Sequence, residues 1–205
     1  MKINEIELKP YEQRAMQSEP IFLQILQDCK PHLSAIDYDV AKYNLYRGIK
    51  NATDKFGKKT VRLTDRSPMD TPQELHDELN AYFDQKYGHP YRNGVFATPR
   101  KKNAEFYGTS FSIYPIGNYE MIHNEKIMDL TDQVVVTYQE LKHWGEKPPI
   151  GKFLEDNWPP YSTNNPKRAA LSGNESMIWC KEYYYLAQSL ATDFYIYMKL
   201  KGIKT

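Results

Sequence analysis

The sequence predicts an α+β fold, and three observations lead to this class. Hydrophobic residues make up 40% of the 205 residues and charged residues 26%, which is typical of a domain with a buried core. Short segments with the pattern of strands lie between segments with the spacing of helices. No repeat and no low-complexity linker divides the chain. We therefore expect a single domain over residues 1–205, with a helical N-terminal part over about 1–42.

The first half of the chain is predicted to begin with helices and to continue with strands. Ser18 can cap a helix that Pro31 ends, and a second short helix follows. Thr71 opens a capping box, and Gly88 ends the helix that this box begins. The expected elements of this half are helices over 19–30, 32–41 and 72–87 and strands over 43–48 and 59–63.

The second half mixes both kinds of element. Thr98 is the expected N-cap of a short helix that Gly108 closes. The region 127–154 is expected to contain helix, although Val134–Val136 also permits a strand. A loop rich in proline and asparagine is expected over 156–166. The other expected elements are strands over 94–97, 110–116, 119–122 and 176–186 and helices over 99–107 and 189–201.

Composition excludes several classes of protein. The formal net charge is +1, so the chain lacks the overall basic character of a protein that binds duplex nucleic acid. Its apolar runs are far shorter than the roughly 20 residues that cross a bilayer, and Met1–Ile6 has no signal-peptide pattern. Two cysteines and five histidines without ligand spacing predict neither a disulfide framework nor a metal site. We expect a cytoplasmic protein with no membrane contact.

Three polar positions stand at the ends of predicted strands. Arg47 and Gly48 end the first strand, Thr98 follows a later one, and Glu175 stands where a polar loop enters an apolar strand. Each position also has an ordinary structural explanation. The arginine can pair with a carboxylate at a sheet edge, the threonine can cap a helix, and the glutamate can be solvated surface.

In chain order, these segments resemble the arginine-serine-glutamate class of mono-ADP-ribosyltransferases. The matching residues are Tyr46-Arg47-Gly48, Phe96-Ala97-Thr98 with Ala104 and Phe106 behind it, and Glu175-Ser176-Met177-Ile178. The resemblance spans residues 43–186. It implies a split, mostly antiparallel β-sheet core. It also implies that NAD is the substrate and that ADP-ribose passes to a macromolecular acceptor, either host protein or nucleic acid, or to water.

The resemblance assigns catalysis to Glu175, Thr98 and Arg47. Breaking the bond between nicotinamide and ribose passes through an oxocarbenium-like state, which a fixed carboxylate stabilises. The Arg47 fork would hold a phosphate of NAD, and Thr98 would orient the ribose or Glu175. The expected NAD-binding residues are Arg47, Gly48, Thr98, Phe106 and Tyr107, with a tyrosine near Tyr183 as another stacking partner.

This sequence departs from the class in two places. One concerns the acceptor, and the other concerns the residue that stands where the class has its serine. Members that modify arginine carry Gln or Glu two residues before the catalytic glutamate, whereas Gly173 stands here, so we expect a non-arginine acceptor. The loop over 164–174, with Lys167 and Arg168, would address that acceptor. Thr109 and Ser110 compete with Thr98 for the serine role.

A second resemblance leads to a non-enzymatic alternative. The segments 66–71 and 91–117 are similar to uncharacterised proteins of tailed bacteriophages. The alternative is a phage-related structural or interaction protein that keeps the fold without catalysis. An RNA-binding module that uses the 17 tyrosines is a third reading, which the neutral charge disfavours.

Overall fold

A computed structural model describes residues 8–68, 71–143, 145 and 148–203. Its helices are α1 (Pro10–Gln17), α2 (Glu19–Asp28), α3 (Lys30–Ala35), α4 (Gln73–Tyr87), α5 (Lys101–Glu105), α6 (Val136–His143), α7 (Ile150–Asn157), α8 (Pro166–Ser172) and α9 (Gln188–Leu200). Its strands are β1 (Tyr46–Ile49), β2 (Phe56–Thr60), β3 (Val95–Ala97), β4 (Thr109–Pro115), β5 (Glu120–His123), β6 (Ser162–Thr163), β7 (Ser176–Trp179) and β8 (Glu182–Ala187). A 3₁₀ turn, η1 (Tyr91–Asn93), and a π-helical segment, η2 (Thr131–Val135), also occur.

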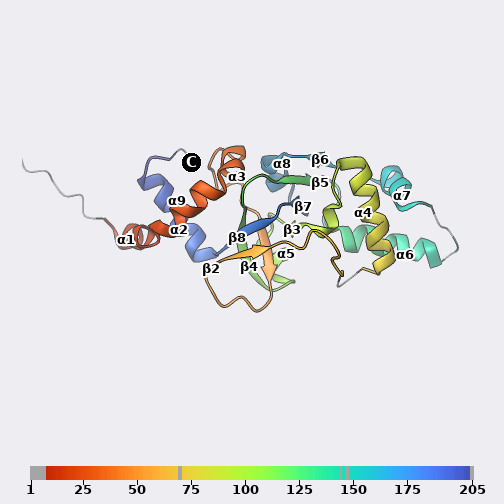
Figure 1. Ribbon diagram of the computed structural model, residues 1–205, viewed down its shortest axis with the longest axis horizontal. Coiled ribbons are helices and arrows are strands. Elements are labelled where there is room, and N and C mark those ends of the chain that lie inside the picture. Colours follow the sequence, from red (N-terminus) through yellow and green to blue (C-terminus); the bar gives the residue numbers. More distant parts are fainter. Residues whose placement is uncertain (1–7, 69–70, 144, 146–147, 204–205) are drawn as a thin grey trace, which may run out of the picture.

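Two four-stranded sheets occupy the middle of the molecule (Figure 1). Sheet A has the order β1-β4-β8-β2 and sheet B the order β3-β7-β5-β6, and all paired strands are antiparallel. The sheets meet beside β3, where the Tyr46 N–H donates to the Thr98 carbonyl at 2.7 Å and the Thr98 N–H donates back at 2.9 Å. The predicted α+β class with a split, antiparallel core is confirmed.

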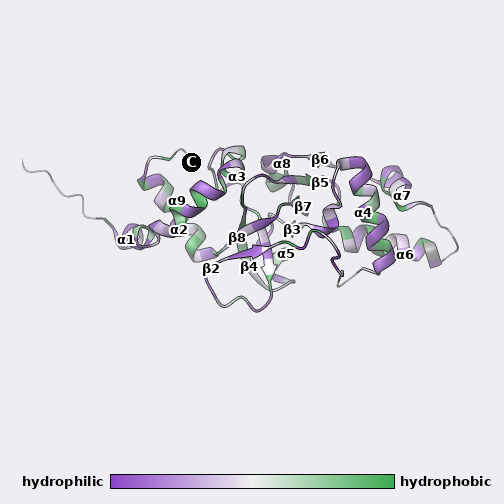
Figure 2. Cartoon of the chain, viewed as in Figure 1, coloured by the Kyte–Doolittle hydropathy of each residue, from purple (hydrophilic) through white to green (hydrophobic). Residues whose placement is uncertain are grey.

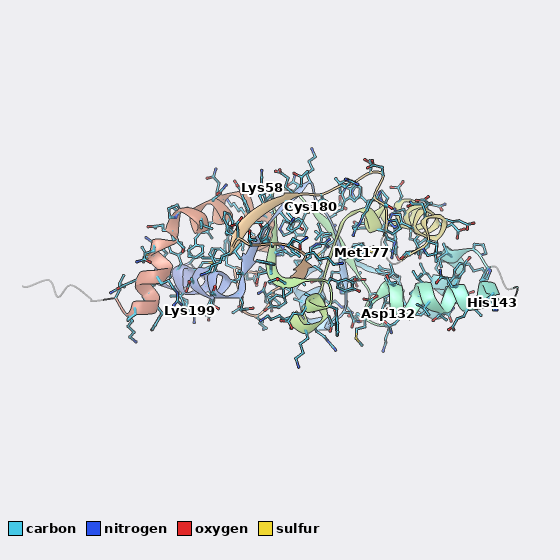
Figure 3. All side chains as sticks on the ribbon, turned by 90° about the horizontal axis from the view of Figure 1, so that it is seen from below. Lys58, Asp132, His143, Met177, Cys180 and Lys199 are labelled. Atoms are coloured by element: carbon cyan, nitrogen blue, oxygen red, sulfur yellow. The ribbon has the colours of Figure 1, made fainter. Side chains whose placement is uncertain are left out.

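The two ends of the molecule are helical (Figure 1). Helices α1, α2 and α9 lie at one end and α4, α6 and α7 at the other (Figure 1). Hydrophobic and hydrophilic residues alternate around them, which is typical of helices with one buried face (Figure 2). Figure 3 shows Met177 and Cys180 in the middle, between Lys199 at one end and His143 at the other.

The first and last helices form one packed unit. The Phe22 ring lies 5.2 Å from that of Phe194 and 5.3 Å from that of Tyr197, measured between ring centroids. The Arg14 guanidinium donates to both carboxylate oxygens of Asp193, at 2.8–3.0 Å. These contacts hold α1 and α2 against α9, so helices from both ends of the chain cover one side of sheet A.

The N-terminal helices differ from the prediction in their boundaries. Helix α1 is an element that the sequence pattern did not predict, and the Ser18 side chain makes no capping bond to α2. Pro31 does not end a helix but lies in the first turn of α3, a position that needs no N–H donor. Helix α3 ends at Ala35 rather than at residue 41, because Asp37 and Tyr38 adopt positive φ angles.

Both predicted capping residues of the middle region have other partners. Pro72, not Thr71, is the N-cap of α4, and the Thr71 hydroxyl accepts a hydrogen bond from Arg92 instead. Arg100, not Thr98, is the N-cap of α5. The end of α4 at Gly88 is confirmed, with φ +88°. Helix within 127–154 is also confirmed by η2, α6 and α7.

Most predicted strands are present, with one important error. Strands β3, β4 and β5 confirm three predictions to within a residue, while β1 and β2 are shifted by about three residues. The predicted single strand over 176–186 is wrong, because Cys180 and Lys181 divide it into β7 and β8, which belong to different sheets. The predicted loop over 156–166 contains β6, and α8 begins at its end.

A few expectations concern residues outside the description. The N-terminal segment Met1–Ile6, as well as Met69 and Asp70, falls there. Within the residues that the structure describes, no helix has both the length and the apolar character to cross a membrane. Cys29 and Cys180 are buried free thiols.

Candidate active site

Residues from β1, β3, α5, the start of β7 and β8 line one cavity of about 410 Å³. Five of the six residues that the sequence predicted for the site belong to this lining: Arg47, Gly48, Thr98, Tyr107 and Glu175. Phe106, the sixth, is outside it, and its side chain is 84% exposed. The topology explains the convergence, because the cavity lies beside the junction of the two sheets.

Glu175 and Thr98 are brought together by strand register. In the antiparallel pair of β3 and β7, Ala97 is opposite Ser176, and Thr98 and Glu175 are the next residues along the two chains beyond this last pair. The chain reaches this point through Gly173, which ends α8 with φ +77°. The side-chain amide of Asn174 then donates to the Asn124 carbonyl at 3.0 Å, which fixes the approach to β7.

Glu175 is a half-buried carboxyl with few compensating donors. Its pKa is raised to about 8, chiefly by burial and also by the charge of Asp129, while the N–H of Leu130 and the charges of Arg92 and Arg47 act in the opposite direction. The Leu130 N–H donates to Glu175 Oε2 at 3.2 Å. A glutamate held with a pKa near neutrality in a cavity is typical of a functional carboxyl.

The segment that precedes η2 holds Glu175 in place. The Glu175 N–H donates to the Met128 carbonyl at 3.1 Å. Asp129 accepts the N–H groups of Thr131 and Asp132, at 2.8 and 3.1 Å, and so begins the helical segment. π-Helical turns such as η2 occur often at functional sites.

Arg47 spans the junction between the sheets. Its backbone pairs with Phe111 of β4, and its side-chain Nη1 donates to the Phe96 carbonyl of β3 at 2.8 Å. It also bonds to the Tyr183 hydroxyl, whose pKa burial raises and Arg47 lowers. Arg47 therefore has structural partners, and its guanidinium also borders the cavity.

Gly48 lets α5 approach β1 closely. A Cβ at this position would lie 2.1 Å from the carbonyl oxygen of Ala104 and 2.8 Å from the backbone of Tyr107. Thr98 borders the same space, and its hydroxyl oxygen accepts the N–H of Arg100 at 3.2 Å. Tyr107, at the end of α5, donates its hydroxyl to Asp129 at 3.0 Å. Of the two competing candidates, Thr109 is exposed at the start of β4 and Ser110 is buried in it, and neither belongs to the cavity lining.

Two further arginines line the cavity, and sequence reasoning missed both. Arg66 comes from the loop before α4, and Arg92, which is 4% exposed, comes from η1. His76 of α4 is a third addition. Both arginines lie in the segments 66–71 and 91–117 that are similar to phage proteins, but nothing in their spacing from the other motifs indicates a role in the site.

The expected acceptor loop has a different structure from the prediction. Most of 164–174 is helix α8, with Asn165 as its N-cap. Lys167 forms an ion pair with Asp37, and Arg168 forms one with Glu125. Gly173 is required by the left-handed end of α8, where a Cβ would lie 2.8 Å from the Arg100 guanidinium. Both cations thus have carboxylate partners on this side of the molecule.

Comparison with known proteins adds no relative. Neither the family models, nor the curated proteins, nor the solved structures contain a match to this chain.

Proposed function

We propose that this chain catalyses NAD-dependent mono-ADP-ribosyl transfer, with hydrolysis of NAD as the simplest case. One observation carries the proposal: Arg47, Thr98 and Glu175, which come from three distant parts of the chain, line the same cavity. Its volume of 410 Å³ is within the range of small-molecule sites, about 300–1,000 Å³. The fold and the register of β3 with β7 are consistent with such a site.

The proposed reaction divides the work among these residues. The bond from ribose C1′ to the nicotinamide nitrogen breaks, and its electron pair leaves with nicotinamide. The ionised form of Glu175 stabilises the positive charge that develops on the ribose. A nucleophile then bonds to C1′ and loses a proton. Arg47 binds phosphate, Thr98 orients the ribose, and Tyr107 and Tyr183 supply aromatic surface.

The proposed acceptor is not arginine. The pKa of a guanidinium is above about 12, so arginine attacks only with the help of a neighbouring base, and Gly173 offers no side chain for that purpose. The proposed acceptor is instead a different protein side chain, a nucleic-acid base or water. The proposed setting is the cytoplasm, where NAD is available, and the host cytoplasm if the chain is encoded by a phage.

The decisive experiment is to incubate the purified chain with NAD and to measure released nicotinamide by chromatography. We expect release above that of a mock preparation from cells with an empty vector. Labelled NAD, supplied with separate pools of host protein and nucleic acid, then identifies the acceptor. Release no faster than in the mock preparation would reject the activity, and label on protein arginines would reject the proposed acceptor class.

Arg47→Lys is expected to weaken NAD binding by about tenfold, because a point charge on a flexible stem cannot reproduce a bidentate clamp on phosphate. Titration calorimetry with NAD measures the affinity, and a melting curve measures the fold. The matched control is Arg62→Lys, an exposed position outside the cavity lining. A lower melting temperature with unchanged NAD affinity would instead make Arg47 a purely structural residue.

The non-enzymatic alternative has one observation in its favour. The Arg47 guanidinium already donates to the Phe96 carbonyl across the junction between the sheets, at 2.8 Å, so its position is explained without a ligand. In this alternative the chain is a phage-related interaction protein, and Arg47 serves the junction between the sheets. The nicotinamide assay separates the two proposals, because only the enzyme consumes NAD.

A further inference from the structure

Arg66 and Arg92 lie together at the cavity, around the ring of Phe96. Their guanidinium carbons are 5.1 and 5.5 Å from the centroid of that ring. Arg66 donates through Nη1 to the carbonyls of Arg92 and Gly94, which fixes the two side chains relative to each other. The two arginines thus form a rigid cationic cluster on an aromatic surface.

Arg92 is held firmly yet keeps one donor unused. Its Nη2 donates to the Thr71 hydroxyl at 2.8 Å, and its Nε points to His76 Nδ1 at 3.4 Å. Its backbone N–H donates to Asn80 Oδ1 at 3.0 Å. Arg92 Nη1 is buried and has no hydrogen-bond partner in the described part of the chain. A buried guanidinium nitrogen without an acceptor is costly, so this nitrogen is suited to an incoming ligand atom.

Among the residues that the structure describes, the cluster also lacks a paired negative charge. Across the described ranges, no carboxylate lies within 4.0 Å of the Arg66 or Arg92 guanidinium. The pKa of Arg66 is lowered to about 10, chiefly by burial and also by the positive charges of Arg47 and Arg92. Glu175 is the carboxyl that lines this cavity, against Arg47, Arg66 and Arg92. An anion would relieve this mutual repulsion.

We propose that Arg66 and Arg92 form a phosphoryl-binding subsite, separate from Arg47 and independent of the chemistry at Glu175. The unused Nη1 of Arg92 is one donor, and the outer edge of Arg66 supplies others. Planar guanidinium forks match the oxygens of a phosphoryl group and bind it with charge-assisted hydrogen bonds. The identity of the natural ligand rests on the proposed function. If that function holds, the subsite receives one phosphoryl group of the NAD pyrophosphate.

Inorganic pyrophosphate is the probe that tests the subsite. Titration calorimetry at pH 7 and low salt compares the wild type with Arg66→Gln, Arg66→Lys and the control Arg62→Gln. Arg62 is exposed, lies four residues from Arg66 and does not line the cavity. We expect Arg66→Gln to weaken binding by at least about tenfold, Arg66→Lys to weaken it less, and Arg62→Gln to leave it unchanged. Melting curves verify that each variant is folded.

The outcomes separate this inference from the proposed function. Binding of pyrophosphate that requires Arg66 supports the subsite, even if no nicotinamide is ever released from NAD. Absence of binding to the folded wild type, or equal loss in Arg66→Gln and Arg62→Gln, overturns the subsite, even if NAD is consumed. If Arg66→Gln does not fold, the Arg66→Lys variant tests the subsite in its place. An affinity for pyrophosphate and a salt dependence equal to those of the wild type would then show that binding does not need the guanidinium group of Arg66, and would reject the subsite.

Discussion

Glu175→Gln is expected to lower the rate of nicotinamide release from NAD by about 100- to 1,000-fold while the protein still binds NAD. The amide keeps the shape of the side chain and an acceptor for the Leu130 N–H, but it cannot supply the negative charge that the ribose requires in the transition state. Single-turnover kinetics measure the rate, and titration with NAD measures binding. A variant with most of the wild-type rate would remove Glu175 from catalysis.

The pH dependence gives this prediction a second readout. Because burial raises the pKa of Glu175 to about 8, the wild-type kcat/KM is expected to rise with pH through about 8 and then to level off. Glu175→Gln should lose this rise and keep a flat profile. A wild-type profile that falls between pH 6 and 9 would contradict an ionised Glu175.

The raised pKa of Glu175 also predicts that the stability of the fold decreases as pH rises, whereas the rate of the reaction increases. A carboxyl whose folded pKa is raised contributes stability at low pH, and this contribution is lost as pH rises through the folded value. Glu175→Gln should therefore melt above the wild type at pH 8.5 and close to it near pH 4.5. Melting curves at the two pH values measure the difference.

Gly48→Ala is expected to destabilise the fold by about 2–3 kcal/mol, because its Cβ would meet backbone atoms that cannot move aside. The nearest atom is the carbonyl oxygen of Ala104, at 2.1 Å, so α5 must shift away from β1. With about 2–4 °C of melting temperature lost per kcal/mol in a chain of this size, thermal denaturation resolves the effect.

Gly57→Ala is the matched control, since it is the same substitution in β2, the opposite edge strand of sheet A. There the added Cβ would meet the hydroxyl end of the Tyr185 side chain at 2.3 Å, and a side chain can rotate where backbone cannot. We expect a smaller loss than at Gly48. Equal melting temperatures for both variants would show that α5 is not held by close contact at Gly48.

The sequence predicted much of the site because its residues stand at strand ends with recognisable neighbours. Thr98 directly follows β3 and Glu175 directly precedes β7, while Arg47 lies within β1, and antiparallel pairing then brings these positions close together. The arrangement could not be predicted from strand patterns alone, however. Which strands pair is decided by contacts between residues as far apart as Lys59 and Tyr183.

The missed features share a physical cause. The division at Cys180 is hidden because apolar residues stand before and after it, Met177 and Ile178 on one side and Tyr183 and Tyr184 on the other, and the exposed Lys181 fits a polar position of one alternating strand. Arg66 and Arg92 resemble surface residues in a sequence, since arginine is rarely buried. Thr71 fits a capping box, yet its hydroxyl serves Arg92 instead. Predictions from local sequence patterns were therefore wrong where the same polar atoms form hydrogen bonds to residues distant in the sequence.

The place of β7 and β8 as the last strands in sequence order has a consequence for biosynthesis. Each is an interior strand, β7 between β3 and β5 and β8 between β4 and β2, so neither sheet can close until residues 176–187 have left the ribosome. Until then the earlier strands present unpaired edges. Such late, long-range pairing slows folding, and the nascent chain is exposed to aggregation throughout its synthesis.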